Sequence, residues 1–210
     1  MSKFNEYIKK LENLDCSESF LKSDKTVLLL SGSSDYETSA LSDLQKDFLK
    51  IFKNYGYKVI KSNFPYNGNF EHKNFKNISI LKAGISNIVY YIHTLYNPKF
   101  RKEIKRHFMP LYEIDDIIIV TQSSGLNLLK VALKNCDMSS KKMKIFALGA
   151  FACGYGKIQN CMIFKGKKDI YSKFMDFHKC DVKVDCGHFD YLKNGQVKEI
   201  IHEWLEKNKN

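Results

Sequence analysis

The feature that most constrains the fold of this chain is a β-rich apolar run that passes through a short polar turn into a helix, at residues 115–128. Ile117–Val120 is the most strand-like run in the sequence, and leucines at helical spacing follow the turn. Ser123 occupies the turn, with Gly125 two residues later. This layout predicts a strand-to-helix turn that holds a serine at the carboxyl end of a strand.

The same alternation of strand and helix patterns runs through the rest of the chain. Besides the helix after Ser123, we predict strands at 26–30, 57–60, 117–120, 143–148, 161–164 and 182–184, and helices at 39–54, 78–95, 97–112, 171–178 and 197–205. Alternation of this kind predicts an α/β fold, a three-layer sandwich with a mostly parallel twisted sheet and helices on both faces. With 210 residues, of which 44% are hydrophobic, we expect one domain over 1–210, with 1–24 as an N-terminal helical extension.

The formal net charge of +11 raises the possibility of an anionic partner. The basic residues are scattered rather than clustered, so we expect solvated basic faces and no nucleic acid, with a basic nucleic-acid binder as an alternative. Residues 97–112 form a basic helical insertion, and we expect its apolar side to pack on the domain. The alternatives for this segment are a weak contact with an anionic membrane and a partial cap over the site.

The sequence also bears on location and on cofactors. No stretch approaches the ~18 apolar residues of a membrane span, and the N-terminus lacks the apolar core of a secretory signal. Six scattered cysteines in a chain of this length do not require disulfides. We therefore expect reduced thiols and a cytoplasmic protein, and leave the oligomeric state open.

Two loops at the carboxyl ends of later strands supply partners for Ser123. Asp169 follows the strand at 161–164, and His188 follows the strand at 182–184. A serine hydroxyl needs a base to accept its proton, histidine suits that task near neutral pH, and a carboxylate orients the histidine. The chain order serine, aspartate, histidine is the order found with the nucleophile elbow.

Each of these residues also has a structural interpretation. Ser123 is a candidate helix N-cap, Asp169 suits the first turn of the 171–178 helix, and His188 is a candidate loop histidine. His178, Cys180, Cys186 and His188 are residue types that bind zinc, but the spacing of the cysteines does not fit a zinc knuckle. The glycine-rich segment 149–157 lacks the phosphate-binding motifs, so we expect a flexible loop facing the site.

Five segments, each at a predicted strand end, resemble the α/β-hydrolase family over roughly residues 26–206. They are LLLSGSSD at 28–35, YGYKVIKSNFPYNGNF at 55–70, IIIVTQSSG at 117–125, FKGKKD at 164–169 and CGHF at 186–189. In that family these positions carry an oxyanion-hole loop, a following strand and loop, the nucleophile elbow, the acid and the histidine. Thr121 and Ser31 depart from the family pattern, which usually has glycine and histidine there.

The resemblance implies a role for each residue of the site. Ser123 would be the nucleophile, His188 the general base and then acid, and Asp169 the orienting acid. The backbone N–H groups of Ser33 and Ser124 would form the oxyanion hole. Gly32 and Gly125 would contact substrate.

The implied activity is that of a serine hydrolase cleaving carboxylic esters or thioesters through an acyl-enzyme, without metal or organic cofactor. The short stretch between the strands at 143–148 and 161–164 leaves no room for a lid, so we expect a fairly open site. The partner would be a small-molecule acyl ester or thioester. The alternatives are a non-catalytic binding protein with the same fold and an acyltransferase.

Overall fold

A computed structural model describes residues 2–33 and 35–209 and contains a six-stranded sheet in which every pairing is parallel. The strands of this sheet are β1 (Lys25–Ser31), β2 (Lys58–Val59), β3 (Asp116–Gln122), β4 (Lys142–Leu148), β6 (Cys161–Gly166) and β8 (Val182–Val184). Their order is β2-β1-β3-β4-β6-β8. The predicted α/β fold with a largely parallel sheet is confirmed.

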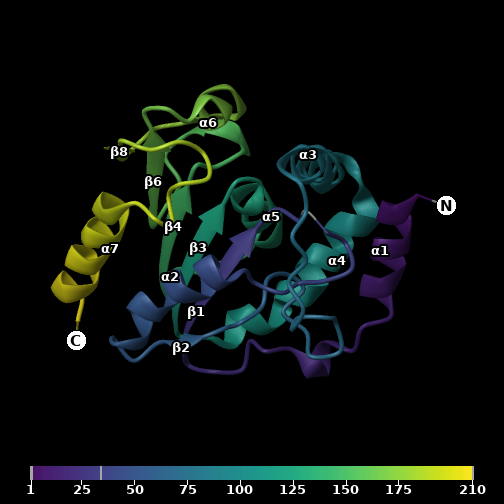
Figure 1. The fold of residues 1–210 in the computed structure, drawn as a ribbon. Helices are drawn as coiled ribbons and strands as arrows, with labels where there is room; N and C mark the ends of the chain where they lie inside the picture. The colour runs from purple at the N-terminus through teal and green to yellow at the C-terminus, as the bar shows by residue number, and fades with distance from the viewer. Residues whose placement is uncertain (1, 34, 210) are drawn as a thin grey trace.

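Helices cover both faces of this sheet (Figure 1). They are α1 (Lys3–Glu12), α2 (Asp43–Lys53), α3 (Ile80–Tyr96), α4 (Pro98–Phe108), α5 (Gly125–Ala132), α6 (Ile170–Met175) and α7 (Gly195–Lys207), with 3-10 turns η1 (Cys16–Glu18) and η2 (Met109–Glu113). α2 and α7 pack on one face, whereas α5, with α4, α3 and α1 outside it, covers the other. The result is a three-layer sandwich.

The central strand β3 shows how the sequence builds these layers. Ile117 and Ile119 lie in the core beneath α4 and α5, and Ile118 and Val120 lie in the core beneath α2 and α7. All four side chains are fully buried. A strand with both faces covered has no solvent side, which is why its sequence is a continuous apolar run rather than an alternating one.

A second, two-stranded sheet lies outside the predicted architecture. β5 (Ala152–Gly156) pairs in parallel with β7 (Asp176–His178). Segment 149–157 was expected to be a flexible loop, and the helix at 171–178 was expected to reach His178. Both expectations are wrong, because α6 ends at Met175 and the chain then extends to pair with β5.

Two other helices differ from their predicted form. α2 begins at Asp43 instead of residue 39, because Ser42 and Gln45 form a capping box that fixes the start of the helix. Residues 97–112 are helical, as α4 and η2, and Phe100, Ile104 and Phe108 are fully buried. The apolar side of this basic segment therefore packs on the domain, as expected.

Two further observations concern the whole described chain. All six cysteines are free thiols. Within residues 2–33 and 35–209, no helix combines the length and the apolar character needed to cross a bilayer.

Candidate active site

Ser123 lies in a sharp turn between the end of β3 at Gln122 and the start of α5 at Gly125. Its φ is 50°, in the left-handed region that non-glycine residues rarely enter and that costs them ~1–3 kcal/mol. The N-cap of α5 is Ser124, and its side chain forms no capping hydrogen bond. The interpretation of Ser123 as a helix cap is therefore wrong, and the turn has the strand-to-helix geometry of a nucleophile elbow.

The elbow requires glycine at position 125. A Cβ atom there would lie 1.9 Å from the carbonyl oxygen of Leu30 in β1, so the first turn of α5 presses directly on the neighbouring strand. Gly125 is buried and is not one of the residues that line the pocket. Its role in the structure is close packing rather than the substrate contact expected for it.

The ends of β1 and β3 bring the predicted oxyanion loop beside the elbow. Ser31 and Gln122 are paired across the two strands, so Gly32 and Ser123 are the next residues on neighbouring strands. Asn63 fixes this loop, accepting from the Ser31 N–H at 3.1 Å and donating to the Ser31 hydroxyl at 2.9 Å. Ser31 therefore supports the loop.

Gly32 stands at the narrowest point of this arrangement. A Cβ atom on Gly32 would lie 1.9 Å from Asn87 Oδ1 and 2.1 Å from Ser124 Oγ. Both of those oxygens are buried, and neither has a hydrogen-bond partner among the described residues. The absence of a side chain at position 32 thus allows α3, α5 and the loop after β1 to meet.

The two N–H groups predicted to form the oxyanion hole have no hydrogen-bond partner among the described residues. Across residues 2–33 and 35–209, neither the Ser33 N–H nor the Ser124 N–H forms a hydrogen bond. The Ser33 hydroxyl donates to the carbonyl of Asp35 at 2.7 Å, which folds the loop back on itself. Unpaired amides next to the Ser123 hydroxyl are suited to stabilise a negative charge that develops there.

Asp169 and His188 meet at the carboxyl ends of β6 and β8. Asp169 Oδ2 lies 3.0 Å from His188 Nδ1, and the carboxylate is fully buried. Asp169 Oδ1 also accepts the Ser172 N–H at 3.0 Å as the N-cap of α6. The two interpretations of Asp169 are therefore compatible, since one oxygen begins the helix and the other holds the histidine.

Tyr191 completes the environment of the carboxylate and was not found from the sequence. Its hydroxyl donates to Asp169 Oδ2 at 2.8 Å and accepts the Gly166 N–H at 2.6 Å. Burial by itself raises the pKa of Asp169, but the hydrogen bonds from His188, Ser172 and Tyr191 outweigh it and lower the pKa to about 2. Asp169 is thus a permanent anion near neutral pH.

An ionised carboxylate only accepts hydrogen bonds, so His188 carries its proton on Nδ1 and keeps Nε2 as an acceptor. Phe151 connects this imidazole to the elbow. Its ring stacks on His188 with centroids 4.8 Å apart, and its N–H donates to the carbonyl of Ser123 at 2.8 Å. Tyr171 and Phe189 also contact the imidazole ring.

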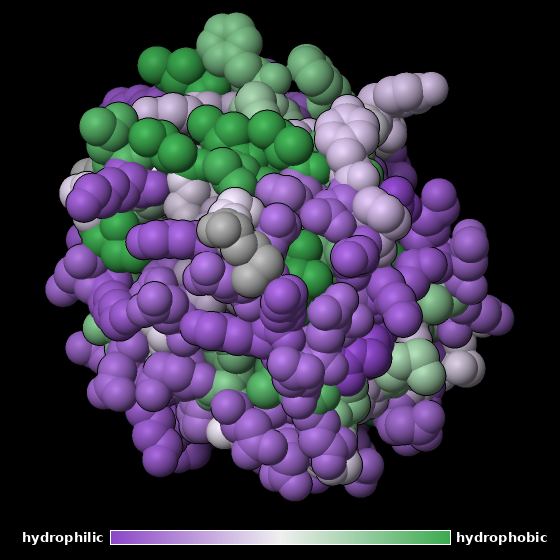
Figure 2. Space-filling view, turned by 90° about the vertical axis from the view of Figure 1, so that its right-hand side faces the viewer, coloured by the Kyte–Doolittle hydropathy of each residue, from purple (hydrophilic) through white to green (hydrophobic). Residues whose placement is uncertain are grey.

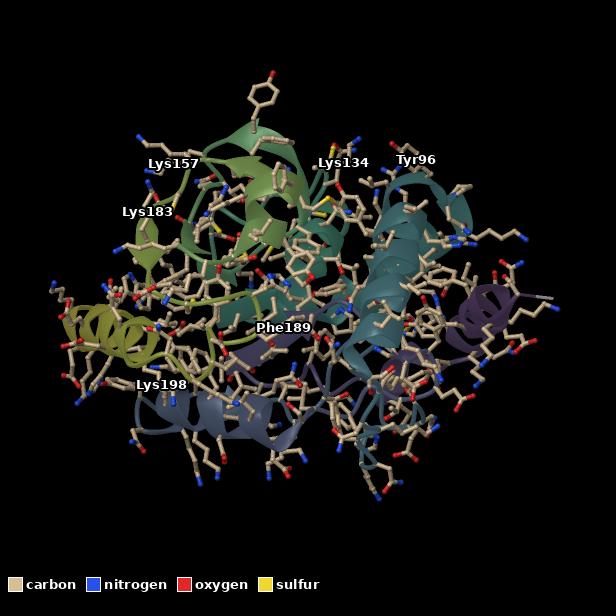
Figure 3. The ribbon with its side chains drawn as sticks, turned by 45° about the horizontal axis from the view of Figure 1, so that its top comes forward. Tyr96, Lys134, Lys157, Lys183, Phe189 and Lys198 are labelled. Carbon is tan, nitrogen blue, oxygen red and sulfur yellow. The ribbon has the colours of Figure 1, made fainter. Side chains whose placement is uncertain are left out.

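Ser123 and His188 line the same open pocket, of about 260 Å³. Gly32 and Ser33 line it as well, and Phe75, Lys76, Asn87 and Phe189 form part of its wall. Figure 3 shows Phe189 near the centre of the view, between α3 and α7. No hydrogen bond joins Ser123 Oγ to His188 in the described part of the chain, and such bonds are often long before substrate binds.

Other histidines are accounted for by packing. His178 is buried against Asp176, with Nδ1 2.5 Å from Oδ1, and His107 is buried beside the carbonyl of Leu11. Among the described residues, no group of three histidine, cysteine or acidic side chains is arranged to hold a metal ion. Cys180 bonds to backbone carbonyls instead.

The parallel sheet, the elbow at Ser123, and the order of serine, aspartate and histidine at successive strand ends are those of the α/β-hydrolase fold. No family model matches this chain, and no curated protein matches it in sequence.

Several solved structures are similar to this chain over most of its length. A predicted CIB-like hydrolase from Thermoplasma acidophilum is 14% identical, with 88% of each chain covered and a TM-score of 0.47. A carboxylesterase from Mesorhizobium loti is 14% identical, with 88% of this chain and 90% of that chain covered and a TM-score of 0.41. A carboxylesterase from Bacillus cereus is 15% identical, with 89% of each chain covered and a TM-score of 0.44. At these low identities, the activity must be argued from the site itself.

Proposed function

We propose that this protein is a serine hydrolase that cleaves carboxylic ester or thioester bonds. The observation that carries the proposal is the shared pocket of Ser123 and His188, in which the serine sits at a strained elbow and the imidazole is held by a buried, ionised Asp169. The Tyr191 hydroxyl donates to Asp169 Oδ2 and positions the carboxylate, which in turn orients His188.

In the proposed reaction, Ser123 Oγ attacks the acyl carbon of the substrate while its proton passes to His188 Nε2. The carbonyl oxygen becomes an oxyanion, which the N–H groups of Ser33 and Ser124 stabilise. Each such donor contributes about 3–4 kcal/mol to the transition state. Asp169 stabilises the imidazolium that forms.

The tetrahedral intermediate then collapses, and the bond to the alcohol or thiol breaks. His188 gives its proton to that leaving group, and the acyl group remains on Ser123. A water molecule, deprotonated by His188, attacks the acyl-enzyme and releases the acid. Every proton in the cycle is carried by His188, so the proposed reaction uses no cofactor.

Hydrolysis of p-nitrophenyl acetate and of a short acyl thioester tests the proposal. We expect wild-type protein to hydrolyse at least one of them and Ser123→Ala to lose ~10⁴-fold or more in kcat. Ser140→Ala is the matched control, because Ser140 is an exposed serine just before the amino end of β4. Equal rates of hydrolysis by Ser123→Ala and wild type would exclude Ser123 as the nucleophile, and no hydrolysis by either protein would favour a non-catalytic binding protein.

A further inference from the structure

The end of the molecule that carries the pocket also carries an apolar surface with no partner. On α3, large apolar side chains recur at helical spacing on the solvent side: Leu81, Ile85, Ile88, Ile92 and Tyr96. They are between 47% and 78% exposed. A surface helix of a globular protein normally packs such an apolar stripe against the core, so the exposed stripe on α3 is unusual.

A second group of exposed apolar side chains belongs to the small sheet and the segments next to it. Its members are Tyr155 on β5, Ile170, Tyr171 and Phe174 on α6, Phe177 on β7, and Phe189 at the pocket. α3 and β5 both pack against α5, so α3 and the small sheet lie on the same side of the main sheet. We call the two groups together the apolar face.

The space-filling view shows how these residues gather. In Figure 2, hydrophobic side chains form a band across the upper end of the molecule, whereas the remainder of the visible surface is mostly hydrophilic. Figure 1 places α3, α6 and the end of β8 at that same end. The apolar face therefore borders the candidate site, and Phe189 belongs to both.

Basic side chains dominate the stretches that carry most of the apolar face, and exposed acidic residues, Asp185 and Asp190, lie near its Phe189 end. Between residues 152 and 180 the exposed charged side chains are all lysines: Lys157, Lys167, Lys168, Lys173 and Lys179. The two aspartates in that stretch, Asp169 and Asp176, are buried. Between residues 72 and 102 there is no acidic residue. Lysine side chains extend from an apolar surface to reach anionic groups, which is how proteins sit on charged membranes.

We propose that the apolar face docks on an anionic lipid surface. Its aliphatic and aromatic side chains would enter the boundary between head groups and acyl chains, and its lysines would lie at the level of the anionic head groups. A second copy of this chain fits less well, because pairing the face with itself would bring lysines against lysines. Docking in this position would turn the pocket, with Phe189 at its edge, toward the lipid.

This proposal stands apart from the proposed hydrolysis, because binding can be measured with Ser123→Ala protein, which leaves lipid intact. Flotation with vesicles of phosphatidylglycerol and phosphatidylcholine is compared with flotation with phosphatidylcholine alone. We expect binding to the anionic vesicles, at least about tenfold weaker binding to the neutral ones, and release in 0.5 M salt.

Three single substitutions locate the surface. Ile85→Glu and Phe174→Glu place a charge on the apolar face, and we expect each to weaken binding to anionic vesicles about tenfold. Met109→Glu is the matched control, because Met109 is 60% exposed, like Ile85 at 59%, but lies in η2, before the amino end of β3. Circular dichroism confirms that each variant is folded.

Three results would overturn the proposal. The first is equal binding by all three variants, and the second is no binding by wild type to either vesicle. The third is a concentration-dependent dimer in sedimentation equilibrium that Ile85→Glu dissociates, which would assign the apolar face to a second copy. Absence of hydrolysis by wild-type protein that still binds the vesicles would contradict the proposed function and leave the docking surface standing.

Discussion

The molecule contains two aspartate–histidine pairs with the same chemistry and different surroundings. In each, a buried carboxylate accepts from histidine Nδ1, at 3.0 Å in Asp169–His188 and at 2.5 Å in Asp176–His178. The second pair lies in β7, behind the apolar face. If a carboxylate and an imidazole were sufficient for catalysis, the chain would have two candidate sites.

The difference lies at the other ring nitrogen. Nε2 of His178 accepts a hydrogen bond from Lys130 Nζ at 3.0 Å, and the side chain is 1% exposed. Lys165 Nζ lies 2.9 Å from the remaining oxygen of Asp176, so the carboxylate of this pair is also held by a cation. Nε2 of His188 is not engaged by any described residue, and its ring borders the pocket that contains Ser123.

The comparison indicates that access and the state of Nε2, rather than the pair itself, separate a candidate catalytic histidine from a structural one. The Lys130–His178–Asp176–Lys165 chain joins α5, β7 and β6. This chain of polar contacts therefore connects the small sheet to the main sheet and positions the exposed aromatic residues of the apolar face.

The largest expected effect is a loss of activity at the Asp169–His188 pair, whose histidine borders the pocket. His188→Gln removes the base, and we expect kcat for ester hydrolysis to fall by roughly 10⁴-fold or more with little change in stability. The measurement is kcat with a p-nitrophenyl ester, alongside urea unfolding. Retained hydrolysis in His188→Gln would remove the distinction between the two pairs.

Substitution in the buried Asp176–His178 pair should have the opposite effect, lowering stability and leaving activity almost unchanged. His178→Gln leaves Asp176 buried with one fewer partner, and we expect the free energy of unfolding to fall by about 3 kcal/mol. Hydrolysis per folded molecule should stay within a fewfold of wild type. Urea unfolding and kcat at low temperature give both quantities. A folded His178→Gln protein without activity would place the second pair in the reaction.

The smallest effect concerns pH. The pKa of Asp169 is about 2 in the folded protein and ~3.9 in an unfolded chain, so the ionised carboxylate stabilises the fold by about 2–3 kcal/mol at pH 7. This contribution is complete above pH ~5 and is lost as pH falls through 2, with about half gone at pH 3.

We therefore expect the difference in the free energy of unfolding between wild type and Asp169→Asn to decrease from pH 7 to pH 3, as measured by urea unfolding. Asp43→Asn is a suitable control, because the Asp43 side chain is 95% exposed. A gap that is constant with pH would show that the carboxylate is not held as an anion.

The sequence was sufficient to find the main sheet and the candidate site, because the relevant signals are local. The β3 run is apolar throughout, and Ser123, Asp169 and His188 each follow a recognisable strand. Buried parallel strands and the turns after them leave a clear pattern in sequence.

The small sheet was missed because its pattern is inverted. In β7 the polar residues Asp176 and His178 point inward and Phe177 points outward, which is opposite to the pattern of a half-buried strand. β5 is short and contains two glycines. The role of Tyr191 was also hidden, because its hydrogen bonds to Asp169 and Gly166 exist only after β6 and the loop after β8 are assembled.

The most direct test of the central claim is to identify the residue that reacts with a fluorophosphonate. The protein is treated with the probe, digested, and analysed by peptide mass spectrometry, with His188→Gln treated in parallel. The account predicts a single adduct on Ser123 in wild type and strongly reduced labelling in His188→Gln, because the histidine activates the serine. An adduct on another residue, or equal labelling in both proteins, would contradict it.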